Sequence, residues 1–309
     1  MKAVLMDQHG GPEMLRYGDA PDPIAKPGEV VVDIHAATVN AADYKVRQGG
    51  GHGAAALKFP YILGRDFSGV VSALGAGVTD LAIGDAVFGV TPQGVEGAYA
   101  ETIAIASAIV AKKPAKLGHA ETAAMALTSL TALVSLEDTL KLKSGETILI
   151  QGGAGGVAGF AIQLAKHIGA KVITTASAKN HDYVKSLGAD QIIDYNKDDF
   201  SKIVSHCDAV FDTVGGSVRA GSYTVLKSGG RLAWIAGAPE GFKIPRDDVQ
   251  TLRPNVGRDR PHLERMVQLY EAGAVWPPTI VRYKLSDAAE AHRVSESRHL
   301  QGKLVFIVR

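Results

Sequence analysis

The stretch ILIQGGAGGVA at residues 148–158 decides the fold, because it places a glycine pattern directly between an expected strand and an expected helix. Within it, Gly153-x-Gly155-x-x-Ala158 matches the fingerprint of a dinucleotide-binding turn. We expect Gly153 to permit the tight turn and Gly155 to let the backbone approach a pyrophosphate. Ala158 would let the helix pack closely on the strand.

The start of the expected helix adds an anion site to this turn. Gly156 and Val157 open the helix, whose free N–H groups and positive dipole end would face the phosphates. The alternative is a glycine-rich turn that holds no ligand, and the regular strands and helices on either side argue against it. We therefore expect Gly153, Gly155, Gly156 and Val157 to bind a cofactor.

The pattern around this turn divides the chain of 309 residues, whose length suits two domains. From residue 146 onward, strands alternate with helices of about ten residues, which predicts a parallel, doubly wound sheet. Residues 1 to about 120 instead contain short β-branched runs split by turn residues, and residues 49–53 form a glycine-rich loop. We predict an α/β protein in which a Rossmann domain (residues 121–261) is inserted into a β-rich catalytic domain (residues 1–120 and 262–309).

Composition excludes several classes of function. The net charge is +1, without a lysine and arginine cluster, so we expect neither nucleic acid nor an anionic membrane as a partner. Cys207 is the single cysteine, which rules out an internal disulfide and a multi-thiolate zinc site. No run of about 18 apolar residues occurs, and the N-terminal residues lack a secretory signal, so we expect a soluble cytoplasmic protein.

The strand after the glycine turn indicates which nicotinamide cofactor is bound. A site for NAD usually carries Asp or Glu about 20 residues after the fingerprint, to hold the ribose 2′-hydroxyl. Here the strand ends in TAS at residues 175–177, and Lys179 follows. The Ser177 hydroxyl and the Lys179 ammonium suit a 2′-phosphate, which a carboxylate would repel. We expect NADPH, the alternative being that Lys179 is a solvated loop lysine.

Several separate segments together resemble one family. The segments are VNAADYKVRQG (39–49), LGRDFSGVV (63–71), ALTSLTAL (126–133), SLGADQIIDY (186–195) and DAAEAHRVSESRHLQGKLVFIV (287–308). In this order they resemble the medium-chain dehydrogenase/reductase superfamily, in its zinc-free quinone oxidoreductase-like branch. The resemblance implies that the β-rich domain is GroES-like and that the chain forms a homodimer.

Comparison with the zinc alcohol dehydrogenases predicts that no metal is bound. Where those proteins carry a cysteine ligand this chain has Asn40, and where they carry the His-Glu pair of a GHE motif it has Arg65 and Asp66. Zinc needs three or four N, S or O ligands, and the ten histidines form no compensating cluster. We expect Arg65 and Asp66 to form a structural ion pair.

The same resemblance implies which residues meet the substrate. It places Asn40 at the nicotinamide end of the site, where its amide would donate to the substrate oxygen; the alternative is a turn asparagine that holds local backbone. Tyr44 and Lys45 would face the same place, although some relatives have tyrosine where Lys45 stands, and Lys45 as a solvated side chain is the alternative.

Two more residues are placed at the cofactor by resemblance. Thr131 would lie against the nicotinamide ring, and Tyr195 at the adenosine end. Their alternatives are a small helix-packing residue and an aromatic side chain that covers the sheet. Lys303 would either reach the cofactor or only precede the last strand, and we do not count it among the site residues.

The resemblance implies an NADPH-dependent enzyme that transfers hydride to a quinone or to the C=C bond of an α,β-unsaturated carbonyl. In either reaction negative charge builds on an oxygen, which a hydrogen-bond donor stabilises. Two alternatives stay open: a zinc-free alcohol or aldehyde oxidoreductase, and a non-catalytic NADPH-binding sensor or structural protein.

Overall fold

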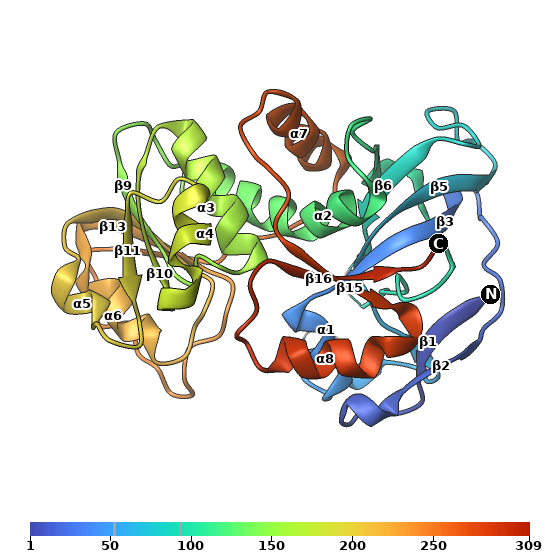
Figure 1. The fold of residues 1–309 in the computed structure, drawn as a ribbon, viewed down its shortest axis with the longest axis horizontal. Helices are drawn as coiled ribbons and strands as arrows, with labels where there is room; N and C mark the ends of the chain where they lie inside the picture. Colours follow the sequence, from blue (N-terminus) through green and yellow to red (C-terminus); the bar gives the residue numbers. More distant parts are fainter. Residues whose placement is uncertain (52–53, 93) are drawn as a thin grey trace. The chain divides into compact units, whose positions relative to one another are not determined.

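The computed structural model describes residues 1–51, 54–92 and 94–309, so part of the predicted 49–53 loop lies outside the described residues. The chain forms two compact units (Figure 1). Unit 1 consists of Met1–Leu127, Arg258–Glu271 and Pro277–Arg309, and unit 2 of Thr128–Gly257 and Ala272–Trp276. The predicted fold class is confirmed, whereas the domain ranges 1–120 with 262–309, and 121–261, stay a prediction.

Unit 2 is built on one sheet in which every neighbouring pair of strands is parallel. The strand order is β11-β10-β9-β12-β13-β14. The strands are β9 (Thr147–Ile150), β10 (Lys171–Ala176), β11 (Gln191–Asp194), β12 (Cys207–Asp212), β13 (Leu226–Trp234) and β14 (Gln250–Leu252). The chain leaves β9 toward one edge and returns through β12 toward the other. The carboxyl ends of β9 and β12 therefore mark the switch point at which such sheets bind ligands.

Helices cover both faces of this sheet, α3 and α4 on one side and α5 and α6 on the other (Figure 1). They are α3 (Gly156–Ile168), α4 (His181–Ser186), α5 (Phe200–Ile203) and α6 (Val218–Thr224). Because both faces are covered, the central strands are continuously apolar: Ile148, Leu149 and Ile150 of β9 are all fully buried. Cys207 at the start of β12 is equally buried, and burial raises the pKa of its thiol to about 12.

Unit 1 contains a mostly antiparallel sheet with the order β15-β16-β3-β5-β6-β8, in which β7 also pairs with β3, and a smaller sheet, β2-β1-β4. The strands are β1 (Lys2–Met6), β2 (Leu15–Asp19), β3 (Glu29–Val39), β4 (Tyr61–Ile62), β5 (Asp66–Leu74), β6 (Ala86–Val90), β7 (Thr102–Ala106), β8 (Val110–Lys112), β15 (Ile280–Lys284) and β16 (Lys303–Ile307). The C-terminal strand β16 pairs with β3 from the N-terminal part, with Leu304 opposite Val39 (Figure 1). This register brings Lys303 beside the residue that follows β3.

The helices of unit 1 are α1 (Ala41–Arg47), α7 (Arg260–Glu271) and α8 (Ala288–Glu296). The helix α2 (His119–Leu133) begins in unit 1, ends in unit 2 and continues as a π-helical segment, Val134–Thr139. None of the helices described is long and apolar enough to span a membrane.

Candidate functional site

The glycine turn connects β9 to α3 at the switch point of the unit 2 sheet. Its left-handed residue is Gly152, with φ +74°, whereas Gly153, which we expected to permit the tight turn, does not have a positive φ. Gly153 is required for a different reason: a Cβ there would lie 2.5 Å from Oγ1 of Thr174 and 3.1 Å from Cδ1 of Ile162. Gly152 thus forms the turn, and Gly153 leaves room for α3 and β10 to pack beside it.

The N-terminus of α3 is open to a ligand. Gly155 is its N-cap, in extended conformation, and neither a capping side chain nor an acidic residue occupies the first turn. A Cβ at Gly155 would meet only the carbonyl oxygen of Gly152, at 3.4 Å. Gly155, Gly156 and Val157 are half-buried, so their backbone can be reached from outside. An uncapped helix start beside glycines without side chains suits a diphosphate.

The carboxyl end of β10 carries polar groups of the kind expected at a 2′-phosphate. Ser177 is half-buried and its hydroxyl accepts from Nδ2 of Asn180 at 3.2 Å, whereas Lys179 is exposed. The preceding Thr175 hydroxyl is already used, because it accepts from the Gly152 N–H at 3.0 Å and donates to Oε1 of Gln151 at 2.8 Å. Ser177 and Lys179 are therefore the groups of this strand end that remain for a phosphate.

Tyr195 and Thr131 lie on other elements of unit 2. Tyr195 directly follows β11, the parallel neighbour of β10, and its side chain is 46% exposed. It therefore belongs to the same edge of the sheet as Ser177, and its exposure disagrees with the alternative of a side chain covering the sheet. Thr131 is buried in α2, where its carbonyl accepts from the Ser135 hydroxyl at 2.7 Å. Its approach to a nicotinamide stays a prediction.

Asn40 lies at the centre of a polar network in unit 1. It is the N-cap of α1, and its N–H donates to Oδ2 of Asp43 at 2.8 Å. Its side chain reaches further: Nδ2 donates to Oδ1 of Asp66 at 2.8 Å, and Oδ1 accepts from Nζ of Lys303 at 2.7 Å. Asn40 is thus more than a turn residue, because its amide joins β5 and β16.

Lys303 belongs to this network although the sequence analysis left it aside. The side chain is 5% exposed, and Nζ also donates to the carbonyl oxygen of Val39 at 2.9 Å. Burial lowers its pKa, and the neighbouring carboxylates of Asp66 and Asp43 partly offset that effect. The sequence signal was a lysine at the head of the buried strand KLVFI, where a charge needs a partner.

Tyr44 and Lys45 point in different directions from α1. Successive residues of an α-helix are about 100° apart, so one side chain turns inward and the other outward. Tyr44 is buried, at 8% exposure, and Lys45 is exposed, in agreement with the solvated alternative. Partial desolvation and the nearby Arg298 still lower the pKa of Lys45. The structure places both within five residues of Asn40, on the same short helix.

The expected ion pair between Arg65 and Asp66 was wrong. Arg65 pairs with Glu96, at 3.0 Å, and with Asp43, at 3.6 Å. Asp66 instead accepts from Thr38 at 2.7 Å and from Asn40. Adjacent residues of an extended chain point to opposite faces, so the two side chains cannot meet.

The donor set does not fit zinc. Among the residues described, no group of three or more histidine, cysteine or carboxylate side chains is placed to hold a metal. At the positions compared above, the Asn40 amide is engaged at both ends, and Arg65 and Lys303 bring two cations to the same network. Together with Arg258, these cations offset the carboxylates of Asp43, Asp66 and Glu96, so no net negative charge remains to attract a divalent cation.

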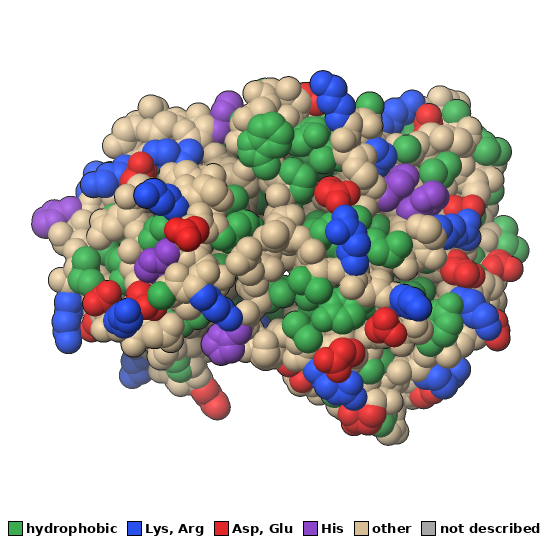
Figure 2. Space-filling model, in the orientation of Figure 1, with side chains coloured by type: hydrophobic (Ala, Val, Ile, Leu, Met, Phe, Trp, Pro, Cys, Tyr) green, Lys and Arg blue, Asp and Glu red, His purple; other side chains and the backbone are tan. Residues whose placement is uncertain are grey.

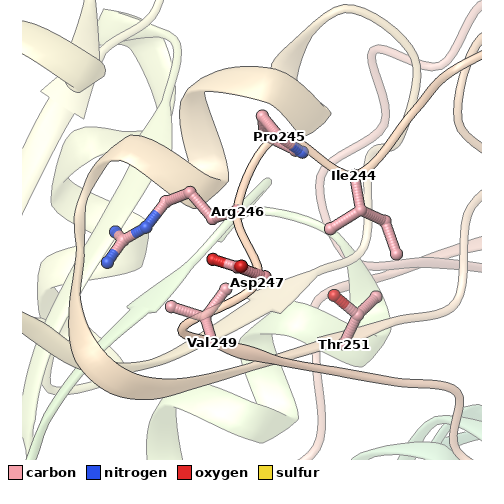
Figure 3. A pocket seen from close by; sticks show the side chains of 6 residues that line it. All are labelled: Ile244, Pro245, Arg246, Asp247, Val249 and Thr251. Carbon is pink, nitrogen blue, oxygen red and sulfur yellow. The ribbon is translucent and has the colours of Figure 1, made fainter.

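A separate surface pocket lies in unit 2 (Figure 3). Its lining residues are Ile244, Pro245, Arg246, Asp247, Val249 and Thr251. Arg246 is fully engaged, since it pairs with Asp248 at 2.6 Å and donates to the carbonyl oxygens of Tyr223 and Leu226. None of the predicted site residues lines this pocket.

Comparison with known proteins agrees with the fold. The family model of the alcohol dehydrogenase GroES-like domain matches residues 26–115, and that of the zinc-binding dehydrogenases matches residues 187–306. The NADPH-dependent alkenal/one oxidoreductase, chloroplastic, of Arabidopsis thaliana is 34% identical over 99% of this chain and 79% of its own.

Two solved structures extend this comparison. The quinone oxidoreductase from Coxiella burnetii is 35% identical, with a TM-score of 0.90 over 100% of this chain and 99% of that one. The Escherichia coli quinone oxidoreductase complexed with NADPH is 27% identical, with a TM-score of 0.91 over 100% of both chains. This chain belongs to the medium-chain dehydrogenase/reductase superfamily, in its quinone oxidoreductase-like branch.

Proposed function

We propose that this protein is a zinc-independent, NADPH-dependent oxidoreductase that transfers hydride to a quinone or to the C=C bond of an α,β-unsaturated carbonyl. The observation that carries the proposal is the uncapped, glycine-lined start of α3 beside a β10 end that carries Ser177 and Lys179. The names of the relatives support it, since one is an NADPH-dependent alkenal/one oxidoreductase and others are quinone oxidoreductases.

The cofactor would be held along the carboxyl edge of the unit 2 sheet. In this proposal the N–H groups of Gly156 and Val157 hold the diphosphate, and Gly153 and Gly155 let it approach the backbone. Ser177 and Lys179 would hold the 2′-phosphate, and Tyr195 the adenosine end. Thr131 would contact the nicotinamide. Lys179 is well suited to a phosphate because its exposed ammonium has no carboxylate beside it on the TAS strand end.

When bound, NADPH supplies the hydride, and the reduction is completed by one proton. The task of this chain is then to stabilise negative charge on the substrate oxygen. Asn40 can do so because one N–H of its amide is used by Asp66 and its second N–H remains for a substrate. We keep Tyr44 and Lys45 with Asn40 as proposed catalytic residues, since Asn40 is the N-cap of α1 and the helix carries the other two.

Zinc independence is part of the proposal. Its support is the chemistry of the network, in which Arg65 and Lys303 supply positive charge beside the three carboxylates of Asp43, Asp66 and Glu96. Such a site polarises an oxygen by hydrogen bonding and not through a Lewis acid.

We further propose a cytoplasmic homodimer without a nucleic-acid or membrane partner. Positive and negative side chains are interspersed over unit 1 on the face shown in Figure 2, and the net charge is +1. The dimer is supported by the edge position of β14, which pairs only with β13 among the described strands. An edge strand has unpaired backbone groups that can pair with another chain. Light scattering of the purified protein measures its mass in solution, and a monomer would remove this part of the proposal.

The central test follows the absorbance of reduced nicotinamide with a quinone and with a simple enone. We expect NADPH to be consumed with at least one of them, without added metal and in the presence of a chelator. Tight NADPH binding without turnover would favour the sensor. Oxidation of an alcohol with NADP⁺, together with stoichiometric zinc, would instead indicate a zinc-dependent alcohol dehydrogenase.

A further inference from the structure

We propose that Lys303 is a positioning residue that fixes the orientation of the Asn40 amide and polarises it for the substrate oxygen. This inference rests on the proposed function, in which Asn40 donates to that oxygen. It assigns a role to a residue from the C-terminal strand, remote in sequence from the glycine turn and from α1.

The contacts of Asn40 permit only one orientation of its amide. The ammonium of Lys303 can donate but not accept, so the atom 2.7 Å from it must be the amide oxygen. The carboxylate of Asp66 accepts only, so the atom 2.8 Å from it must be the amide nitrogen. Rotating the amide by 180° would set donor against donor and acceptor against acceptor. Lys303 and Asp66 thus act as a clamp that leaves one N–H of Asn40 for another acceptor.

Lys303 is itself held firmly enough to do this. β16 pairs with β3 in the register Leu304 to Val39, and the Lys303 ammonium donates to the Val39 carbonyl at 2.9 Å as well as to Asn40. The strand therefore fixes the backbone of Lys303, and the carbonyl fixes its charged end.

The carboxylates around the network favour the charged form of Lys303 and oppose the effect of its burial on the pKa. The three buried carboxylates face three cations, and these groups are Asp43, Asp66, Glu96, Arg65, Arg258 and Lys303. The two carboxylates that bear on Lys303 most directly are Asp66 on β5 and Asp43 on α1. Removing the positive charge of Lys303 would leave the set with a net negative charge, in low dielectric surroundings.

A cation on the amide oxygen strengthens the remaining donor. Hydrogen bonds in a chain polarise one another, so electron density drawn toward Oδ1 makes the Nδ2–H groups better donors. As hydride arrives and negative charge builds on the substrate oxygen, this stronger donor stabilises the transition state more than the ground state. Loss of Lys303 should consequently lower kcat and leave the KM for NADPH nearly unchanged.

The kinetic test compares Lys303→Met, Lys303→Gln and Lys303→Arg. We expect Lys303→Met to lower kcat by roughly 10- to 100-fold, part of what losing a whole oxyanion donor costs. Lys303→Gln, which keeps a donor but no charge, should lose roughly tenfold, and Lys303→Arg should recover part of the loss. The control is Lys113→Met, because Lys113 also holds backbone carbonyls, those of Pro114 and Leu117, and lies outside the network. Its kcat should not change.

A double variant separates positioning from mere stability. If Lys303 acts through Asn40, then Lys303→Met should cost little further activity once Asn40→Ala has removed the amide. Fold-losses that simply multiply would overturn the proposal, as would a kcat unaffected by Lys303→Met and Lys303→Gln.

A readout without turnover keeps this inference distinct from the proposed function. In ¹⁵N-labelled protein, the side-chain amide signal of Asn40 is the one that disappears in Asn40→Ala. Lys303→Met or Lys303→Gln should shift that signal, and Lys113→Met should not. Wild-type protein that reduces neither quinone nor enone would refute the proposed function, whereas an unmoved Asn40 signal in the Lys303 variants would refute the clamp.

Discussion

Nη2 of Arg65 lies 3.0 Å from Oε1 of Glu96, and both side chains are almost wholly buried. Each is also tied to other charged or polar groups, Arg65 to Asp43 and Glu96 to the Tyr61 hydroxyl. A buried ion pair contributes little net stability compared with apolar packing, but breaking one half of it leaves the other charge uncompensated. The stability of unit 1 should depend strongly on this pair.

Arg65→Met should lower the free energy of unfolding by about 3–5 kcal/mol, because Glu96 and Asp43 would lose their cation in a buried site. Urea denaturation followed by circular dichroism measures this change. The control is Arg293→Met, which breaks the exposed pair with Glu290 and should cost about 1 kcal/mol or less. Equal effects of the two substitutions would contradict the buried-pair account.

His292 and Asp43 should give the stability opposite dependences on pH. Both contact the Tyr99 hydroxyl, at 3.2 and 2.8 Å. Burial lowers the pKa of His292 from 6.5 to about 3, so its contribution is complete above pH 6.5 and is lost as the pH falls toward 3. Burial raises the pKa of Asp43 from 3.8 to about 6, so its contribution is complete below pH 3.8 and is lost as the pH rises through 6.

Between pH 4 and 6 the two effects oppose each other in the wild type. Relative to wild type, His292→Gln should therefore lose stability with rising pH and Asp43→Asn should gain it, each by up to about 1.4 kcal/mol per pH unit. The measurement is urea unfolding of the three proteins at several pH values. Parallel pH profiles would show that neither group titrates as its surroundings dictate.

Lys179→Ala should weaken NADPH binding about tenfold and leave NADH binding nearly unchanged, because only NADPH carries the 2′-phosphate. Quenching of protein fluorescence gives both dissociation constants. Lys202→Ala is the matched control, since that exposed lysine of α5 pairs with the N-cap residue Asp199. If NADPH and NADH lose affinity equally, Lys179 does not bind the 2′-phosphate.

Gly153→Ala and Gly155→Ala should separate packing from cofactor binding. The added Cβ at residue 153 collides with Thr174, and such overpacking costs typically about 1–3 kcal/mol. The added Cβ at residue 155 meets only an ordinary contact on an unstrained backbone, so the melting temperature should hardly change. NADPH affinity should fall at least roughly tenfold in Gly155→Ala, because the diphosphate loses its close approach to the backbone. Unchanged NADPH affinity in Gly155→Ala would show that the diphosphate does not bind at this turn.

Local patterns in the sequence predicted much of the fold. What the sequence did not predict depends on contacts between residues that are distant in the sequence. The alternation of strands and helices after residue 146 predicted the parallel sheet, because each βα step is a local pattern. The glycine fingerprint located the turn and attributed it to Gly153, but the residue with positive φ is Gly152, since spacing alone does not give φ. The Arg65–Asp66 pairing failed because adjacency in sequence is not adjacency in space. Lys303 was missed because its partners, Val39 and Asn40, come from the other end of the chain.

The single cysteine of this chain has a consequence for an enzyme that handles enones. The β-carbon that accepts hydride in such substrates also accepts thiolates, so reactive cysteines are alkylated by them. Cys207 is fully buried, and its raised pKa keeps the sulfur protonated at neutral pH. An enzyme whose single thiol is buried and protonated resists alkylation by its own electrophilic substrates.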